Sequence, residues 1–271
     1  MAESGSAVPR TAPAAAPPVD GAAALRRATG SEPERDGAPG SPYVTWLARF
    51  AARRDRPLDA PWTAPVTPSP GRSALVRSIA RFELGESGAG EEIQVRAARL
   101  GGAYAGAIGL FTAEEAAHAA WLGRLRGRFG GAACRHHWTA TAFVALRRAL
   151  GLRTEVLVLL AAEVVALTYY RVLAEADADP ALQAVCSRIL DDERVHVAFH
   201  VDMLGRELPP RSRRATLAAW RGFVAVTAAV VAWDHRGVLA GAGVSRRAFV
   251  AEVRANATAC AGDMTDMAGP T

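Results

Sequence analysis

Glu114-Glu115-Ala116-Ala117-His118 and Asp192-Glu193-Arg194-Val195-His196 are the two short stretches that decide the fold of this chain. Each one contains Glu-x-x-His, and residues three apart lie on the same face of a helix. A composition with six His residues gives two such motifs by chance in about one chain in twenty. The pair therefore predicts two helices that each turn a carboxylate and an imidazole toward a common interior.

Each motif also has a glutamate upstream at nearly the same distance. Glu86 lies 29 residues before Glu115, and Glu163 lies 30 residues before Glu193. If antiparallel helices turn near residues 100 and 178, the rise of about 1.5 Å per residue brings both members of each pair to the same level. The two halves are offset by 77 or 78 residues, which makes this an internal two-fold pattern.

A glutamate from each of two helices and a Glu-x-x-His from each of two others can hold two metal ions inside a four-helix bundle. The mixed oxygen and nitrogen donors favour iron or manganese over a metal that prefers thiolates. Buried carboxylates without a cation are costly, and a metal would compensate their charge. The candidate ligands are Glu86, Glu115, His118, Glu163, Glu193 and His196.

These residues resemble the ferritin-like di-iron carboxylate superfamily, which includes ribonucleotide reductase small subunits, soluble desaturases and bacterial hydroxylases. The resemblance covers about residues 73–206 and implies a four-helix bundle that activates dioxygen. It also implies that the residue before each ligand glutamate binds the far nitrogen of the other motif's imidazole, so Asp192 should face His118 and Glu114 should face His196. The chain lacks the Cys-rich electron-transfer module of rubrerythrins, so a separate reductase would supply electrons.

Two residues compete for, or add to, this ligand set. Glu83 lies three residues before Glu86 and could replace it, but the 77-residue offset favours Glu86. His200 follows His196 by one helical turn and could be a third imidazole ligand or a histidine at the core edge.

Other residues are candidates for proton transfer or for a pocket wall. Asp234 and His235 adjoin after an apolar stretch and could relay protons, or could be an exposed pair near a helix end. Phe111, Tyr169 and Tyr170 could line a pocket, although packing is the commoner role of such residues.

Apolar residues at helical spacing from residue 72 onward predict an all-α fold, a ferritin-like four-helix bundle with additional C-terminal helices. We expect residues 1–41 to form a disordered tail, 42–71 a short helix and an extended linker, and 72–265 the helical domain. Gly and Pro punctuation divides that domain into helices near 73–99, 103–128, 139–176, 181–206, 213–240 and 245–262.

The composition limits the partners and the compartment. All 32 basic residues are arginines scattered along the 271 residues, so the net charge of +5 does not indicate a nucleic-acid partner. The three cysteines are far apart, which suits a reducing, cytoplasmic location. The most apolar stretch, 156–170, is short for a membrane span and contains Glu163, so no membrane association is expected.

The leading hypothesis is therefore a di-iron oxidoreductase that uses dioxygen to hydroxylate, desaturate or N-oxygenate a small or carrier-bound substrate. Two iron ions are the expected cofactor, with an iron–manganese pair left open, and no side chain beyond the metal ligands is assigned a catalytic role. A homodimer through the outer helices is also left open. The alternatives are an iron-oxidising or iron-buffering protein without an organic substrate, and a metal-free helical interaction module.

Overall fold

The computed structural model describes residues 41–88, 90–149 and 151–267, and throughout these ranges the regular structure is helical, with no strand. The all-α prediction is confirmed, while the expected disordered tail lies outside the described residues except for Ser41. The helices are α2 (Pro42–Ala51), α3 (Arg72–Ser87), α4 (Gly90–Ala98), α5 (Gly102–Arg128), α6 (Trp138–Ala149), α7 (Leu152–Glu175), α8 (Pro180–Glu207), α9 (Pro210–Asp234), α10 (Arg236–Gly241) and α11 (Arg246–Asp266).

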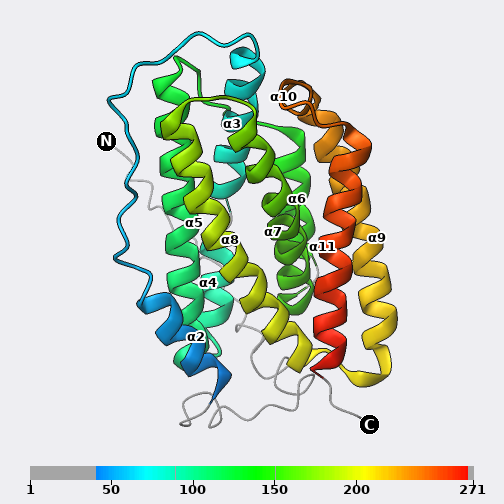
Figure 1. The fold of residues 1–271 in the computed structure, drawn as a ribbon. Helices are drawn as coiled ribbons and strands as arrows, with labels where there is room; N and C mark the ends of the chain where they lie inside the picture. The colour runs from blue at the N-terminus through cyan, green and yellow to red at the C-terminus, as the bar shows by residue number, and fades with distance from the viewer. Residues whose placement is uncertain (1–40, 89, 150, 268–271) are drawn as a thin grey trace, which may run out of the picture. The chain divides into compact units, whose positions relative to one another are not determined.

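Four long helices, α3, α5, α7 and α8, surround the centre of the molecule (Figure 1). Helix α3 packs on α5, α7 packs on α8, and α5 in turn contacts α8. The start of α8 is fixed by Asp179, whose Oδ1 accepts hydrogen bonds of 3.0 Å from the backbone N–H groups of Ala181 and Leu182, with Pro180 in the first turn. These helices bring both Glu-x-x-His motifs to the interior.

Two of the long helices predicted from sequence are each interrupted. The prediction of one helix over 73–99 is wrong, because α3 ends at Ser87 and a new helix, α4, begins at Gly90. The prediction of one helix over 139–176 is also wrong, because Gly151 has a φ of 80° between α6 and α7. Such a φ is incompatible with helix continuation, and glycine adopts it without the steric cost of a Cβ.

The helix predicted over 213–240 is divided as well, into α9 and α10. The break falls at His235, whose backbone φ and ψ are −99° and 18° and whose side chain turns inward. Its Nδ1 lies 2.6 Å from the Oγ of Ser78 on α3, so a tertiary contact accompanies the break.

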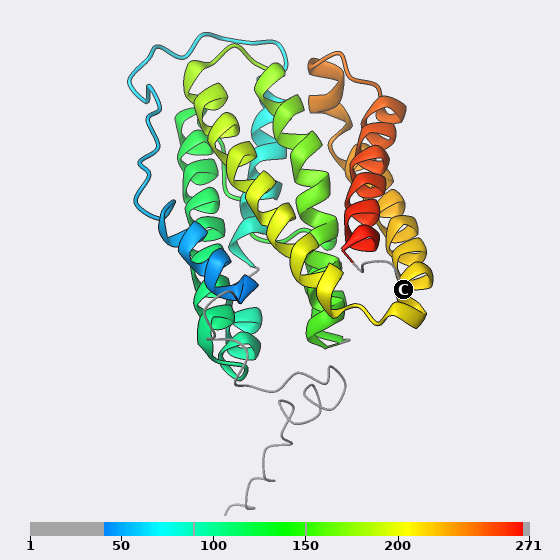
Figure 2. The same ribbon diagram turned by 60° about the horizontal axis from the view of Figure 1, so that its bottom comes forward.

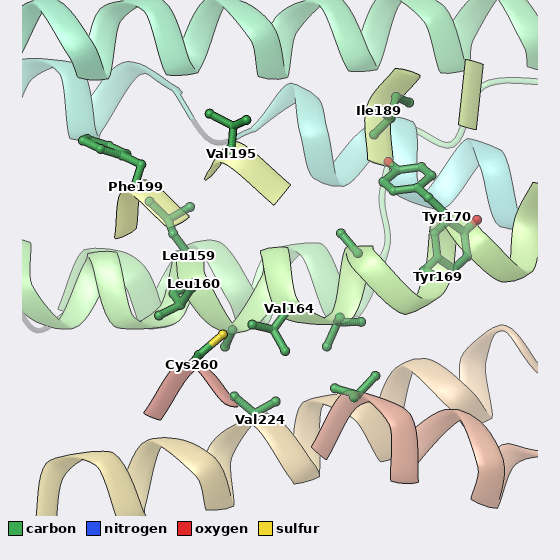
Figure 3. Close-up of a cluster of buried hydrophobic side chains, with 14 of the residues drawn as sticks. Leu159, Leu160, Val164, Tyr169, Tyr170, Ile189, Val195, Phe199, Val224 and Cys260 are labelled. Atoms are coloured by element: carbon green, nitrogen blue, oxygen red, sulfur yellow. The ribbon is translucent and has the colours of Figure 1, made fainter. Parts of the chain in front are cut away.

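Helices α9 and α11 pack on each other and against α7, forming an outer layer beside the four central helices (Figure 2). Figure 3 shows Leu160 and Val164 of α7 lying toward Val224 of α9 and Cys260 of α11. These four side chains belong to one continuous apolar core. Helix α11 also packs against α8, so the outer layer covers both α7 and α8.

Helix α2 and the segment after it dock onto the long helices. The indole Nε1 of Trp46 donates a 2.8 Å hydrogen bond to Asp202 on α8, and Phe50 is fully buried against Phe199. The linker that follows runs along the long helices toward α3, and Arg128 of α5 donates to its backbone at Trp62 and Ala64. Helix α2 is thus followed by turns and irregular chain up to α3.

Two helices have the length and composition to cross a membrane. Helix α7 has 24 residues and a mean hydropathy of 1.9, and α9 has 25 residues and a mean hydropathy of 1.6. The 18-residue apolar window of α7 is 83% buried, which is typical of a core helix in a soluble protein, whereas that of α9 is 28% buried. The sequence estimate made the apolar part of α7 too short; its burial, rather than its length, argues against a membrane span.

Candidate metal centre

Acidic and imidazole side chains from all four central helices meet in the interior. They form two overlapping groups whose ligand atoms lie within 4.8 Å of one another, and either group could hold a metal ion. The first consists of Glu86, Glu115, His118 and Glu193, and the second of Glu115, Glu163, Glu193 and His196. Glu86 comes from α3, Glu115 and His118 from α5, Glu163 from α7, and Glu193 and His196 from α8. The six candidate ligands are therefore brought together.

Both imidazoles turn Nδ1 toward the carboxylates. The Nδ1 of His196 lies 3.1 Å from Glu115 Oε1 and 3.6 Å from Glu163 Oε2. The Nδ1 of His118 lies 3.5 Å from Glu193 Oε1 and 3.6 Å from Glu115 Oε1. Glu115 and Glu193 are the two residues common to both groups, so their carboxylates lie between the imidazoles.

The outer imidazole nitrogens contact carboxylates in a crosswise pairing. The Nε2 of His118 lies 3.3 Å from Asp192 Oδ2, and the Nε2 of His196 lies 2.8 Å from Glu114 Oε2. A proton on Nε2 can be donated to each carboxylate, which leaves the Nδ1 lone pair free to face inward. This is the pairing that the resemblance implied.

The inward atoms test whether the residues fit a metal. The Nδ1 atoms of His118 and His196 are buried and have no hydrogen bond to any described residue, and the same holds for Glu115 Oε1 and Glu193 Oε2. Buried polar atoms without partners are rare, because leaving them unpaired costs about 1–3 kcal/mol each. Carboxylate and imidazole lone pairs that converge on one interior space are the donor set of a metal site, so these residues fit a bound metal ion.

Protonation at the centre is set by burial and by the neighbouring acids. Burial, and then the charge of Glu115, raises the pKa of Glu86 well above its usual value, and burial with the charge of Glu163 does the same for Glu193. Burial also opposes ionisation of Glu163, but its close contacts with Glu193 and with the imidazole of His196 lower its pKa to about 2. Protons and the imidazoles thus partly compensate the carboxylate charge.

Two arginines outside the cluster hold its acidic neighbours, and the sequence analysis missed both. The Nε of Arg188 donates a 2.9 Å hydrogen bond to Asp192 Oδ2, and Arg53, just after α2, donates to Asp192 Oδ1. Arg53 also lies 3.8 Å from Glu114. Burial alone raises the pKa of Asp192, but His118 and Arg188 lower it well below its usual value. Arg188 precedes Asp192 by four residues, which is a local signal; no sequence spacing points to Arg53.

Glu86 has a partner that no sequence pattern indicated. The hydroxyl of Tyr170 donates a hydrogen bond to Glu86 Oε1. Burial, and then the charge of Glu86, raises the pKa of Tyr170 well above its usual value, so its proton stays in place. Tyr170 thereby fixes one oxygen of the first-helix carboxylate.

The alternative ligands lie elsewhere. Glu83 pairs with Arg126, its Oε2 at 2.5 Å from Nε and its Oε1 at 3.1 Å from Nη2, and it belongs to neither acid and imidazole group. His200 is also outside both groups; its ring packs edge-on to Phe111, and burial lowers its pKa to about 4. It is a neutral core histidine in this conformation.

Asp234 and His235 are buried rather than exposed. The Asp234 carboxylate lies 2.9 Å from Arg81 Nη1 and 3.6 Å from His137 Nε2. Burial, and then the charge of Arg81, lowers the pKa of His235 to about 3. The Ser78 hydroxyl joins His235 to the hydroxyl of Tyr169 at 2.8 Å, and among the described residues no hydrogen bond leads from Tyr169 to the cluster.

A cavity of about 330 Å³ adjoins the cluster. Its lining includes four of the candidate ligands, Glu86, Glu115, Glu163 and Glu193, together with side chains of α6 and α9. Phe111, Tyr169 and Tyr170, the residues that the sequence analysis suggested for a pocket wall, are not part of this lining, since all three are fully buried in the core.

No protein-family model, no curated protein and no solved structure matches this chain. The established features are an all-helical fold and a buried carboxylate and imidazole cluster that could hold a metal ion.

Proposed function

We propose that this protein is an oxidoreductase of the ferritin-like di-iron type, which uses dioxygen to oxidise an organic substrate. The observation that carries the proposal is the pair of overlapping acid and imidazole groups, which share two carboxylates and border a cavity. The metal ions would be held by the six candidate ligands, Glu86, Glu115, His118, Glu163, Glu193 and His196.

Two iron ions bound by carboxylates and imidazoles can supply electrons to dioxygen and so make it a strong oxidant. Around that chemistry, each side chain has a defined task. Glu115 and Glu193 belong to both groups, so each would help to hold both ions. Asp192 and Glu114 hold the two imidazoles in the tautomer that offers Nδ1 inward.

The surroundings suit an oxidation that must exclude water. Apart from its acids, the cavity wall is mostly hydrocarbon, which limits side reactions with solvent. The proposal includes a separate reductase as electron donor, since no pair of cysteines lies close enough in sequence to form an electron-transfer module. A cytoplasmic location accords with the three free cysteines.

The test is reconstitution of the metal-free protein with ferrous iron under anaerobic conditions. We expect two iron ions per chain by elemental analysis, and rapid dioxygen consumption when the loaded protein meets air and a reductant. Glu115→Ala should lower the iron content and abolish the dioxygen consumption, while Glu83→Gln, outside both groups, should change neither. Wild-type protein that binds no iron would overturn the proposal.

The same measurement separates an oxidase of organic substrates from an iron-buffering protein. An iron-buffering protein takes up and oxidises many more than two ferrous ions per chain. Uptake that stops at two ions, with dioxygen consumption sustained by the reductant, is the result expected of the proposed enzyme. Continued uptake would overturn it.

A further inference from the structure

The cavity beside the cluster reaches from the candidate ligands to the protein surface. Its inner end includes Glu115 and Glu193, which are almost fully buried. Its lining also includes Trp138 at the start of α6 and Val226 in α9, whose exposed fractions are 55% and 64%. The lining therefore includes exposed side chains as well as candidate ligands. The volume of about 330 Å³ lies in the range of small-molecule sites.

The wall between these two ends is apolar and partly aromatic. It is formed by side chains of α3, α6, α7 and α9, among them Phe82, Phe143, Leu146, Leu159, Phe223 and Val230. Such a wall favours a ligand that loses little hydration on entry, because burying apolar surface contributes about 25 cal/mol per Å².

The cationic side chain in the wall already has an acidic partner. Arg81 is the one cationic side chain among the described residues that line the cavity, and its Nη1 is engaged by Asp234, at 2.9 Å from Oδ1 and 2.8 Å from the backbone carbonyl oxygen. The other ring that can carry charge, His235, is bound through Nδ1 to Ser78 and has a pKa of about 3. An anion therefore gains no unpaired cation from this wall.

The charge of the inner end also disfavours a cationic ligand. In the proposed function, two divalent ions offset the four glutamates that line the cavity. The occupied centre then has no net negative charge to attract a cation. Neither an anionic nor a cationic ligand therefore gains a partner of opposite charge in the cavity.

We propose that the substrate is an uncharged, largely apolar organic molecule that enters between Trp138 and Val226 and occupies this cavity. That this molecule is a substrate, and not only a ligand, rests on the proposed function. The cavity, its apolar wall and the paired state of Arg81 are independent of any metal.

A matched pair of probes tests the charge preference. 2-Naphthylmethanol and 2-naphthoate share one ring system, and only the second is an anion at neutral pH. We expect isothermal titration calorimetry to give saturable binding of one 2-naphthylmethanol per chain, at least tenfold tighter than the binding of 2-naphthoate. Equal affinities, or no saturable binding of the neutral probe, would overturn the inference.

Variants of the wall locate the binding. Ala162→Phe fills the cavity from α7, and Val226→Trp narrows the mouth at an exposed position where the fold is tolerant. Each should weaken the binding of 2-naphthylmethanol at least tenfold. Ala229→Phe, on the exposed face of α9 and outside the lining, is the matched control and should leave the affinity unchanged. Undiminished binding in Val226→Trp with helicity preserved would place the probe elsewhere and overturn the inference.

Iron content measured on the same samples separates this inference from the proposed function. Two iron ions per chain without selective binding of the neutral probe would overturn the inference and leave the proposed function intact. Selective binding by a protein that takes up no iron would overturn the proposed function, and the cavity would then be a ligand site without redox chemistry.

Discussion

At the scale of single residues, Asp192 shows how a side chain outside the cluster can control it. Its carboxylate contacts His118 Nε2, Arg188 and Arg53 together, so it joins the imidazole to two guanidinium groups. Contacts with His118 and Arg188 keep the Asp192 carboxylate ionised, and the ionised carboxylate holds a proton on Nε2 of His118. The orientation of His118 therefore depends on a residue that offers no atom to either metal group.

We expect Asp192→Asn to weaken the binding of ferrous iron or Mn²⁺ by about 10–100-fold, because the neutral amide holds the imidazole less firmly. Competition with a chelator measures this affinity. Asp191→Asn is the matched control: its side chain is 49% exposed and pairs with Arg194, so metal affinity should stay at the wild-type value. Equal affinities in the two variants would show that Asp192 does not support the site.

His235 gives a second prediction, on the pH dependence of stability. Its pKa is lowered to about 3 in the folded protein, chiefly by burial, with Arg81 and His137 adding to the effect, while Asp234 lies 3.5 Å away. Between pH 6.5 and 3 the unfolded chain therefore binds a proton that the folded chain refuses, and stability is lost as the pH falls.

In His235→Gln this loss should disappear. As the pH is lowered from 7.5 to 5, the free energy of unfolding of wild type should fall by about 2 kcal/mol more than that of the variant, measured by urea unfolding. His136→Gln, at an exposed position, should follow the wild-type curve at both pH values. A constant difference between wild type and His235→Gln would contradict a buried neutral imidazole.

At the scale of helices, Gly151 separates α6 from α7 at a φ of 80°, and no atom lies within 4 Å of the position that a Cβ would take. With ψ at 170° the residue lies in a region that is essentially restricted to glycine, so Gly151→Ala should be destabilising by about 1–3 kcal/mol through backbone strain alone. Gly222→Ala, in the middle of α9 with the same open space, should be stabilising by about 0.5–1 kcal/mol. Urea unfolding at one pH compares the two, and effects of the same sign would contradict the conformational explanation.

Helix breaks are also where prediction from sequence failed. Ligand spacing is local: three residues fix a shared face, so Glu115 with His118 and Glu193 with His196 could be placed from the sequence alone. A helix end is different, because glycine stands at both breaks, at Gly88 and Gly151, but also inside α5, at Gly123, so tertiary packing decides whether the backbone turns.

The cavity and the arginine at 53 were unpredictable for a related reason. Arg53 reaches Asp192 across 139 residues of chain, and no periodicity links two such positions. The walls from α6 and α9 likewise depend on how separate helices pack, whereas the metal ligands repeat within the sequence. Local spacing thus predicted the cluster, and only tertiary structure reveals what surrounds it.

At the scale of the whole molecule, the cluster joins four helices at a cost in stability. Glu86, Glu115, Glu163 and Glu193 come from α3, α5, α7 and α8, so their mutual repulsion acts on the packing of the entire bundle. Burial and the charge of Glu163 raise the pKa of Glu193, so the folded chain holds that proton more tightly than the unfolded chain. Stability contributed by the protonated form is lost as the pH rises above about 4.3, the usual Glu value.

Glu193→Gln should therefore stabilise the metal-free protein, by about 1–3 kcal/mol at pH 7.5, which corresponds to a rise of about 2–12 °C in the thermal midpoint. Added Mn²⁺ should raise the midpoint of wild type, because a ligand that binds only the folded state stabilises it, and should have little effect on the variant. Glu83→Gln removes a carboxylate that is paired with Arg126, so its metal-free midpoint should fall while its response to Mn²⁺ remains. If metal-free Glu193→Gln melts below wild type, the carboxylate is compensated within the chain. If Mn²⁺ does not change the thermal midpoint of wild type, the reason to regard the cluster as a metal centre is removed.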